Sequence, residues 1–332
     1  MGRRSRDRTA GGPGHPARPN PTETPRRTGC VVESYGRRVV VLTEDDPPER
    51  LSCKIRGRRT AVVAGDRVTL EPESGTPGPA AAWVVADCLP RRNVLQRTDS
   101  RGGVEDIAAN LDQLGVVVAP RPTCDPFIID RYLAGAGYAG IEPFLILNKQ
   151  DLLGSPGFGP DEFAFLDVYR RIGVPVVTVS AKHGTGLDEL KARLEGRRTL
   201  LAGQSGVGKS SLTNALCQGA YRATSELSTG SGQGKHTTVS SAIVQLPWGE
   251  LTDSPGVRDY APPVMPLPDI QRGYLEIIQR APGCRFQDCL HLREPQCAVQ
   301  AAVQAGEIDP RRLESYRRLV NLTRQLDEKR GW

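Results

Sequence analysis

The sequence predicts a multidomain chain with three folded parts: a small all-β barrel, an α/β domain built on a parallel sheet, and a C-terminal helical domain. Residues 29–97 contain short alternating apolar runs separated by Gly, Pro and Asp, a pattern typical of strands joined by tight turns. Over residues 98–262, apolar runs alternate with helical patterns, as they do in parallel α/β sheets. In residues 263–332, three of the eight Cys fall within fourteen residues, ahead of a long helical pattern.

The composition is that of a packed soluble protein. Of the 332 residues, 38% are hydrophobic and 25% are charged, which is ordinary for a globular chain. No run approaches the roughly eighteen apolar residues that a membrane helix needs, and the N-terminus lacks the apolar core of a secretory signal. We therefore expect a cytoplasmic protein without a membrane partner, and we expect it to be a monomer.

Basic residues gather at both ends of the chain. Residues 1–28 hold seven Arg against two acidic residues, and residues 311–332 hold seven Lys and Arg against three. Such ends suit a nucleic-acid backbone, although solvated surface charge explains them as well. Residues 1–28 also lack apolar periodicity, so we interpret them as a disordered basic tail, with an organellar transit peptide as a minor alternative.

The barrel is predicted from five short runs, which are CVVESYG, RVVVLT, LSCKIRG, DRVTLEP and WVVADC. Five strands suit an OB-type barrel, a fold often used on oligonucleotides. Lys54, Arg56, Arg58 and Arg59 would supply it with a basic face. Surface charge that only keeps the barrel soluble is the competing interpretation.

The α/β domain is predicted from apolar runs at 115–119, 144–147, 175–179 and 199–202, with a helical pattern at 187–194 and two more strands at 242–246 and 250–253. The last segment is predicted to end in a helix that Asp309 caps and Pro310 opens. Its apolar residues spread over one broad side, which we expect to pack inward.

A pattern of the type GxxxxGK[ST], which binds nucleotide phosphates, directly follows the run TLLA. It comprises Gly203, Gln204, Ser205, Gly206, Val207, Gly208, Lys209, Ser210 and Ser211. Its glycines let backbone N–H groups face the phosphates, at the positive end of the helix that follows. Lys209 would reach the β- and γ-phosphates and Ser210 would ligand Mg²⁺, so we expect Mg²⁺ to bind together with the nucleotide.

A second motif selects guanine. After the run at 144–147 come Asn148, Lys149, Gln150 and Asp151. The Asp151 carboxylate can accept two hydrogen bonds from guanine, whereas adenine offers no matching pair of donors. A buried carboxylate facing adenine would be left unsatisfied, at a cost of about 1 to 3 kcal/mol or more.

Two further motifs close other strands of the predicted sheet. Ser180, Ala181 and Lys182 follow the run at 175–179, where a backbone N–H would meet the guanine carbonyl. Asp253 ends the run at 250–253 and begins the sequence DSPG, which finishes at Gly256. Asp253 would hold Mg²⁺ through a water molecule.

The order of these motifs shows that the G domain is circularly permuted, because conventional GTPases carry the phosphate loop before the base-recognition motifs. The chain resembles the RsgA (YjeQ) family of small-subunit-dependent GTPases over about residues 29–330. The shared segments are ANLDQL at 109–114, DRYL at 130–133, NKQDLL at 148–153, GQSGVGKSSL at 203–212, GQGKHTT at 232–238 and DSPGVRDY at 253–260. The resemblance implies a GTPase that binds the small ribosomal subunit and its rRNA, acts in late assembly, and is stimulated by the subunit.

The sequence also contains the family's pattern of zinc ligands. Its four ligands would be Cys284, Cys289, His291 and Cys297. Three thiolates and one imidazole leave no position for water, so the single zinc ion would be structural. The segment that carries these ligands has few apolar residues, and coordination would therefore stabilise it.

The motifs leave open which residue orients the water that attacks the γ-phosphate. Ras-like proteins use a Gln after the DxxG motif to orient the attacking water, but here that position is Val257, so unassisted hydrolysis should be slow. The resemblance implies that His236 orients the water once the ribosome orders its Gly-rich loop, with a merely solvated His as the alternative. Thr238 or Thr237 would sense Mg²⁺ and the γ-phosphate, and the sequence leaves that choice open.

Two rival functions remain at this stage. One is a zinc and OB-barrel RNA-binding protein whose G domain binds GTP or GDP but hardly turns over; hydrolysis measured with and without small subunits separates it from the first hypothesis. The other is a P-loop ATPase or kinase, which the guanine motif at 148–151 disfavours.

Overall fold

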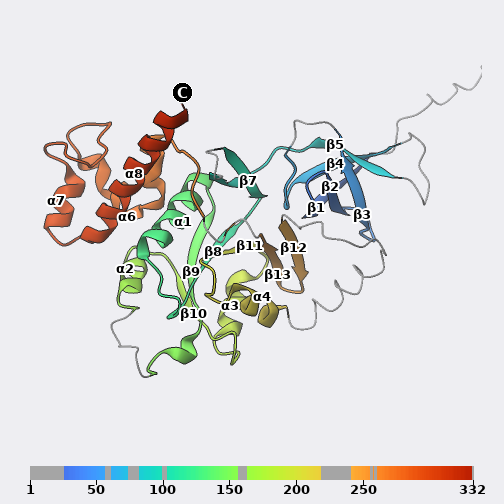
Figure 1. Cartoon of the computed structure of the whole chain (residues 1–332), viewed down its shortest axis with the longest axis horizontal. Helices are drawn as coiled ribbons and strands as arrows, with labels where there is room; N and C mark the ends of the chain where they lie inside the picture. The colour runs from blue at the N-terminus through green and yellow to red at the C-terminus, as the bar shows by residue number, and fades with distance from the viewer. Residues whose placement is uncertain are drawn as a thin grey trace, which may run out of the picture.

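The computed structural model describes residues 26–56, 61–73, 82–98, 103–155, 163–217, 241–254, 257 and 260–330. Most of the predicted tail therefore lies outside the described residues. Its last two residues, Arg27 and Thr28, differ from the prediction because they begin the first strand, β1. Figure 1 shows three parts in a row, with the β-rich part at one end, the α/β part in the middle and the helical part at the other end.

The predicted five-stranded barrel is confirmed. Its strands are β1 (Arg27–Ser34), β2 (Arg38–Thr43), β3 (Arg50–Ile55), β4 (Arg67–Pro72) and β5 (Trp83–Cys88). They pair in the order β1-β2-β3-β5-β4, and β1 also pairs with β4, which closes the barrel. Alternate residues point inward, as expected for half-buried strands, so that Val39 and Val41 of β2 pack with Val31, Val68 and Leu70 in the barrel core.

The charges proposed for a basic face of the barrel are balanced where the structure describes them. Lys54 Nζ lies 2.7 Å from a carboxylate oxygen of Glu73, and Arg56 lies 4.0 Å from Glu71. Arg58 and Arg59 lie outside the described residues. The described part of this face therefore fits the surface-charge interpretation better than a nucleic-acid surface.

The α/β part contains every strand that the sequence predicts. The strands are β8 (Gln113–Val118), β9 (Glu142–Leu147), β10 (Val176–Thr178), β11 (Arg198–Ala202), β12 (Ser241–Leu246) and β13 (Gly249–Asp253). Their order is β10-β9-β8-β11-β13-β12. All neighbours are parallel except β12 and β13, and all six residues of β8 are buried, as is typical of a central parallel strand covered on both faces.

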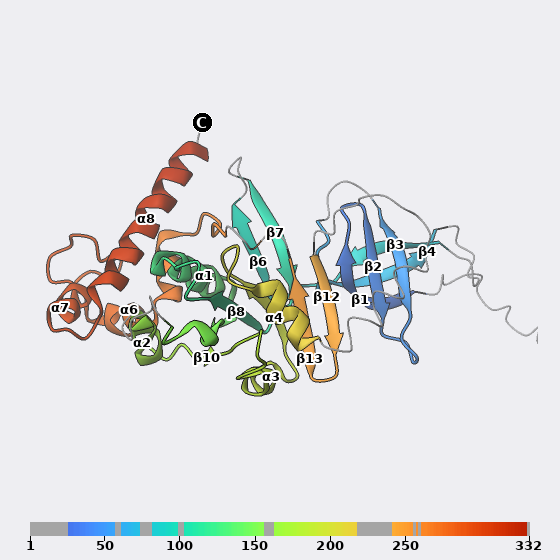
Figure 2. The same ribbon diagram turned by 60° about the horizontal axis from the view of Figure 1, so that its bottom comes forward.

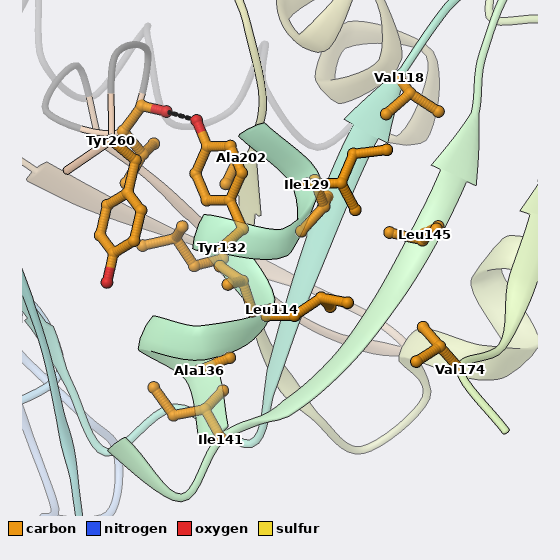
Figure 3. Packing of buried hydrophobic residues seen from close by; sticks show 14 of the residues in the cluster. Leu114, Val118, Ile129, Tyr132, Ala136, Ile141, Leu145, Val174, Ala202 and Tyr260 are labelled. Atoms are coloured by element: carbon orange, nitrogen blue, oxygen red, sulfur yellow. Dashed lines mark hydrogen bonds between the residues drawn. The ribbon is translucent and has the colours of Figure 1, made fainter. Parts of the chain in front are cut away.

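Helices cover both faces of this sheet. They are α1 (Pro126–Ala139), α2 (Phe165–Arg171), α3 (Leu187–Leu194) and α4 (Lys209–Leu216), with a short 3₁₀ helix at Gln150–Leu152. Three residues of β8 pack with α1 and α2; they are Leu114, Val116 and Val118. Figure 3 shows Leu114 beside α1. Val117 faces the opposite way and packs with α3 and α4.

The barrel and the α/β sheet are one continuous sheet, a feature that the sequence does not predict. Strand β12 pairs antiparallel with β1 through Ala242 with Glu33 and Ser241 with Ser34. A separate hairpin, β6 (Val94–Thr98) and β7 (Val104–Ala109), crosses the predicted boundary at residue 97. Figure 2 shows this hairpin between α1 and the barrel.

The C-terminal part is helical, as predicted. It contains a 3₁₀ helix at Leu267–Gly273, α6 (Leu275–Arg280), a 3₁₀ turn at Ala281–Gly283, α7 (Ala298–Gln304) and α8 (Pro310–Arg330). The carboxylate of Asp309 accepts a hydrogen bond from the Arg311 backbone N–H at 2.8 Å, which caps α8 as expected. Tyr316 and Leu319 of α8 pack with Ile277 of α6 in a core of their own, so this part is better packed than its Cys-rich segment alone suggests.

Candidate nucleotide site and metal centre

The nucleotide motifs meet at one edge of the α/β sheet. Strands β10, β9, β8, β11 and β13 are parallel neighbours, so their carboxyl ends share an edge. The loops after these strands carry the phosphate motif at 203–208, the guanine motif at 148–151 and the segment 180–182, and Asp253 is the last residue of β13. Open α/β sheets bind ligands at this edge.

The phosphate loop has a backbone that requires glycine. Gly203 and Gly208 have φ of 136° and 92°, a region that L-residues rarely adopt. A Cβ atom on Gly203 would lie 2.3 Å from the Val117 carbonyl oxygen, and one on Gly208 would lie 2.5 Å from Asn148 Nδ2. The loop therefore fits its neighbours only with glycine at both positions.

Lys209 begins α4 and reaches back over the loop. Its ammonium donates hydrogen bonds to the carbonyl oxygens of Gly203 and Gln204, at 2.5 and 2.6 Å. Ser210 and Ser211, the next two residues of the helix, are exposed. The loop and the first turn of α4 thus place an ammonium group and a hydroxyl group where the phosphate pattern needs them.

Asn148 and Lys149 connect the guanine motif to the phosphate loop. Asn148 Nδ2 donates to the Val207 carbonyl oxygen at 3.0 Å, and its Oδ1 accepts from the Ala181 N–H at 3.1 Å. Lys149 Nζ donates to the carbonyl oxygen of Gly206 at 2.7 Å. These two side chains therefore hold three strand-end loops together.

The Asp151 carboxylate has a hydrogen-bond partner in the neighbouring loop. The Ser180 hydroxyl donates to its Oδ1 at 2.6 Å. This hydrogen bond is the main cause that lowers the pKa of the Asp151 carboxyl below its usual value. The carboxylate is therefore ionised and can act only as an acceptor at neutral pH, as guanine recognition requires. Of the other residues in these two motifs, Gln150 is half-buried and Lys182 is exposed.

The segment after β13 is held by α1. Asp253 ends β13 and is exposed at the same edge as the phosphate loop. Four residues later Val257 is fully buried, and its carbonyl oxygen accepts a hydrogen bond from the Tyr132 hydroxyl at 2.7 Å. The Val257 side chain packs among residues of α1 and the sheet. The residue at the position of the Ras glutamine therefore faces the core.

Some predicted site residues lie outside the described residues. They are Gly256, His236, Thr237 and Thr238. Their assigned roles stay predictions.

The predicted zinc ligands are brought together. Their ligand atoms all lie within 4.8 Å of one another. His291 Nδ1 is 3.3 Å from Cys297 Sγ and 3.6 Å from Cys284 Sγ, and the two sulfur atoms are 3.8 Å apart. A tetrahedral zinc ion separates such ligand atoms by roughly 3.5 to 3.8 Å. The Cys284, Cys289, His291 and Cys297 group therefore fits a zinc ion.

The backbone around this group is fixed by two long side chains. Arg317 of α8 donates to the carbonyl oxygens of His291 and Leu292, at 3.1 and 2.8 Å. The Glu294 carboxylate accepts from the backbone N–H groups of Leu290 and Leu292, at 3.1 and 2.7 Å. The loop that carries the four ligands is thus anchored to α8.

Comparison with known proteins agrees with these motifs. A family model described as RsgA GTPase matches residues 88–261, which is more than half of the chain. The chain belongs to the RsgA family of GTPases. Relatives named small ribosomal subunit biogenesis GTPase RsgA, from Pseudomonas aeruginosa and Pseudomonas putida, are 42% and 39% identical over 298 and 299 residues. Each alignment covers 89% of this chain and 85% of the relative.

Solved structures show the same fold. The crystal structure of YjeQ from Thermotoga maritima matches with a TM-score of 0.70 and 30% identity, covering 90% of this chain and 98% of that protein. YloQ, described as a circularly permuted GTPase, matches with a TM-score of 0.68 and 24% identity, covering 92% of this chain and 96% of YloQ. The permuted order inferred from the motifs is therefore the architecture of the RsgA fold.

Sequence reasoning missed the contacts that join the site of this RsgA family member to its C-terminal part. Tyr132, Asp130 and Arg312 are all buried; Tyr132 contacts the segment after β13, and Asp130 contacts Arg312 across the boundary between the α/β part and the C-terminal part. The first two belong to the DRYL segment, which the sequence analysis used only as a mark of resemblance. The available signal was the pair of charged residues Asp130 and Arg131 inside a helix that is otherwise mostly apolar.

Among the helices that the structure describes, none is long and apolar enough to cross a membrane.

Proposed function

We propose that this protein hydrolyses GTP with Mg²⁺ and acts in the late assembly of the small ribosomal subunit, which stimulates its hydrolysis. The observation that carries the proposal is the convergence of the phosphate loop, the Asn148 and Lys149 contacts and the Asp151 carboxylate at one sheet edge. The names of the relatives, small ribosomal subunit biogenesis GTPase RsgA, supply the partner. The work would take place in the cytoplasm, with the chain as a monomer.

Each nucleotide contact has a candidate in the structure. Asp151 would accept two hydrogen bonds from guanine, and the backbone N–H groups of 203–208 would bind the phosphates. Ser210 and Asp253 would hold Mg²⁺, which neutralises charge on the β- and γ-phosphates when bound. Lys209 would stabilise the same charge.

The catalytic water needs a further group. Val257 offers no hydrogen bond from its side chain and faces the core. His236 is proposed to orient the water in the presence of the subunit, and Thr238 or Thr237 to contact Mg²⁺ and the γ-phosphate. These roles agree with a protein whose hydrolysis depends on its partner.

A structural role is proposed for zinc. Four protein ligands complete a tetrahedral shell, so no position remains for a substrate. The described part of the chain already packs a core between α6, α7 and α8. We therefore assign zinc the task of fixing the loop 284–297, which has few apolar residues of its own.

An arginine-rich groove beside that loop suits rRNA. It has a volume of about 750 Å³ and runs between the zinc loop and α8. Four arginines and two glutamates line it, so its net charge is positive; they are Arg293, Arg317, Arg318, Arg324, Glu294 and Glu314. Arginine side chains bind phosphate groups with two parallel hydrogen bonds. We propose that this groove receives the rRNA backbone.

One experiment tests the function. GTP hydrolysis is measured with and without purified small subunits, for the wild type, for Lys209→Ala, and for Arg318→Ala combined with Arg324→Ala. We expect strong stimulation of the wild type, no hydrolysis by Lys209→Ala, and a higher subunit concentration for half-maximal stimulation of the double variant, with a weaker dependence on salt.

The same measurements distinguish the GTPase from the rival RNA-binding protein. An RNA-binding protein with an inactive G domain would bind subunits and GTP, but its hydrolysis would stay at the unstimulated level. Absence of stimulation in the wild type would therefore refute the GTPase proposal and favour the binding module. Unchanged subunit dependence in the double arginine variant would remove the groove from the interface.

A further inference from the structure

The DRYL segment, residues 130–133, lies in α1 and is not needed for contacts to the nucleotide. Two of its side chains have distant partners. Tyr132 contacts the segment that follows Asp253, and Asp130 contacts helix α8 of the C-terminal part. A single turn of α1 therefore touches both the segment that follows Asp253, the proposed Mg²⁺ ligand, and the domain that carries the zinc ligands.

The contact made by Tyr132 is specific and buried. Its side chain is 1% exposed, and its hydroxyl donates to the Val257 carbonyl oxygen at 2.7 Å. Its ring stacks on Tyr260, with ring centroids 5.0 Å apart and an angle of 13° between the planes. Figure 3 shows the two rings and the bond from the Tyr132 hydroxyl. The chain leaving the DSPG motif is thus attached to α1 at two nearby points.

Small residues of α1 allow this attachment. A Cβ atom on Gly135 would lie 2.0 Å from the Tyr260 hydroxyl oxygen. On the side facing the C-terminal part, a Cβ atom on Gly137 would lie 2.5 Å from the Arg272 carbonyl oxygen. Both neighbours therefore lie directly on the backbone of α1, where a side chain larger than that of glycine would not fit.

The contact made by Asp130 is ionic and buried. Its carboxylate and the Arg312 guanidinium are both fully buried, and they form a hydrogen bond of 2.5 Å. The Tyr169 hydroxyl donates to the same carboxylate at 2.6 Å. Arg312 also donates to Glu276 of α6 at 2.6 Å. Helix α1 is thereby joined to α6 and α8 by charges of which Asp130 and Arg312 are fully buried and Glu276 nearly so.

We propose that Tyr132 is a positioning residue for the GTP-bound state: its hydroxyl fixes the backbone at Val257, and α1 passes the position of that segment to the C-terminal domain through Asp130. This inference rests on the proposed role of Asp253 in holding Mg²⁺, and it adds that the segment from Asp253 to Gly256 senses the γ-phosphate that the same ion contacts. It makes α1, rather than the chain connection at 260–266 alone, the route between nucleotide and zinc domain.

The test compares two substitutions that each remove one hydroxyl from the same pair of rings. Tyr132→Phe deletes the bond to Val257. Tyr260→Phe keeps the stacking and deletes a buried hydroxyl that has no hydrogen-bond partner among the described residues. Dissociation constants are measured for GDP and for a non-hydrolysable GTP analogue without ribosomes. Amide hydrogen exchange over residues 310–320 is compared between the two nucleotides.

We expect the wild type to exchange differently with the two nucleotides over residues 310–320. In Tyr132→Phe this difference should vanish, and the dissociation constant for the GTP analogue should rise about fivefold, the effect of losing one hydrogen bond, while that for GDP changes less than twofold. Tyr260→Phe should behave as the wild type.

Three results would overturn the inference. If Tyr132→Phe matches Tyr260→Phe while the wild type distinguishes the nucleotides, the hydroxyl has no positioning role. If Tyr132→Phe weakens both nucleotides equally, its role is only structural. If the wild type itself shows no difference between GDP and the analogue, the proposed sensing role of Asp253 to Gly256 fails, and the inference fails with it.

Discussion

The Asp151 carboxylate combines the two properties that guanine recognition needs, which are a fixed direction and a negative charge. The hydrogen bond from Ser180 fixes one oxygen and lowers the pKa of the carboxyl. Because the pKa is lowered in the folded state, the ionised carboxylate stabilises the fold, and this stabilisation is fully present above the usual Asp pKa of about 3.9. The stabilisation is lost as the pH falls through the lower pKa of the folded state. Guanine binding should therefore be insensitive to pH between about 5 and 8.

Exchanging this carboxylate for an amide should change which base is read. We expect Asp151→Asn to lose about 10- to 100-fold in GTP affinity and to gain affinity for xanthosine triphosphate, because the amide can donate to the extra carbonyl group of xanthine. Competition binding with both nucleotides measures the shift. Asp188→Asn on α3, whose carboxylate is 99% exposed, is the matched control. Retention of full GTP affinity by Asp151→Asn would show that another residue reads the base.

At this scale the sequence predicts the candidate ligand-binding residues and misses those that support them. The identities of Lys209, Asp151 and the zinc ligands follow from motif spacing, since the chemistry demands those residue types at those positions. The buried state of Val257 and its bond to Tyr132 do not follow, because they depend on the packing of a helix that lies 125 residues earlier in the chain.

Helices α1 and α8 are joined by a buried ionic cluster. Arg312 is fully buried between Asp130 and Glu276, and its guanidinium lies 4.4 Å from the centre of the Tyr274 ring. Burial by itself would lower the pKa of Arg312, but the two carboxylates outweigh it and raise the pKa above its usual value. Each charge in the cluster therefore depends on the presence of the others.

Breaking this cluster should cost far more stability than breaking a surface pair on the same helix. We expect Asp130→Asn to lower the free energy of unfolding by about 3 kcal/mol, because it leaves a buried guanidinium short of a partner. Glu314→Gln removes the exposed partner of Arg318 and should cost less than about 1 kcal/mol. Urea denaturation of both variants checks this.

A double-mutant cycle identifies the source of that cost. Asp130→Asn combined with Arg312→Met should destabilise by less than the sum of the two single changes, since the second change removes the charge that the first left unpaired. Additive effects, or an Asp130→Asn cost no larger than that of Glu314→Gln, would contradict the role assigned to the cluster.

Most of the strands were predictable, and the way in which the barrel joins the α/β sheet was not. Strands β8 to β13 and helix α8 follow from apolar periodicity, turn residues and the cap at Asp309. The β6–β7 hairpin and the pairing of β12 with β1 were missed. Periodicity reports which face of an element is buried, but it carries no information on which distant strand will pair with it.

For the whole molecule, the zinc centre and the nucleotide site should be separable. We expect Cys289→Ser, or removal of zinc by a chelator, to release the loop 284–297 while α8 stays on α1, because the Arg312 cluster does not involve the metal. GTP affinity should change less than twofold. Hydrogen exchange should rise over 284–297 and much less over 310–320.

The matched control for this change is Cys88→Ser, which alters a half-buried thiol far from the four ligands. Subunit binding should weaken in Cys289→Ser and not in Cys88→Ser, since the arginine groove is partly built from the zinc loop. Loss of GTP binding together with loss of zinc would contradict the separation, and protection of 284–297 without metal would remove the structural role of zinc.

The continuous sheet also governs how this protein can be divided. Its closed barrel leaves, in the described part, no open strand at that end, and the opposite end is β10, a strand of only three residues. Short strands are poor templates for other chains. Cutting the chain before β6 to isolate the GTPase part would remove the partners of Ser241 and Ala242 at the start of β12, whose backbone groups on that side would then be unpaired. An isolated GTPase fragment would therefore expose more of the β12 edge than the intact chain does, and we expect it to aggregate more readily.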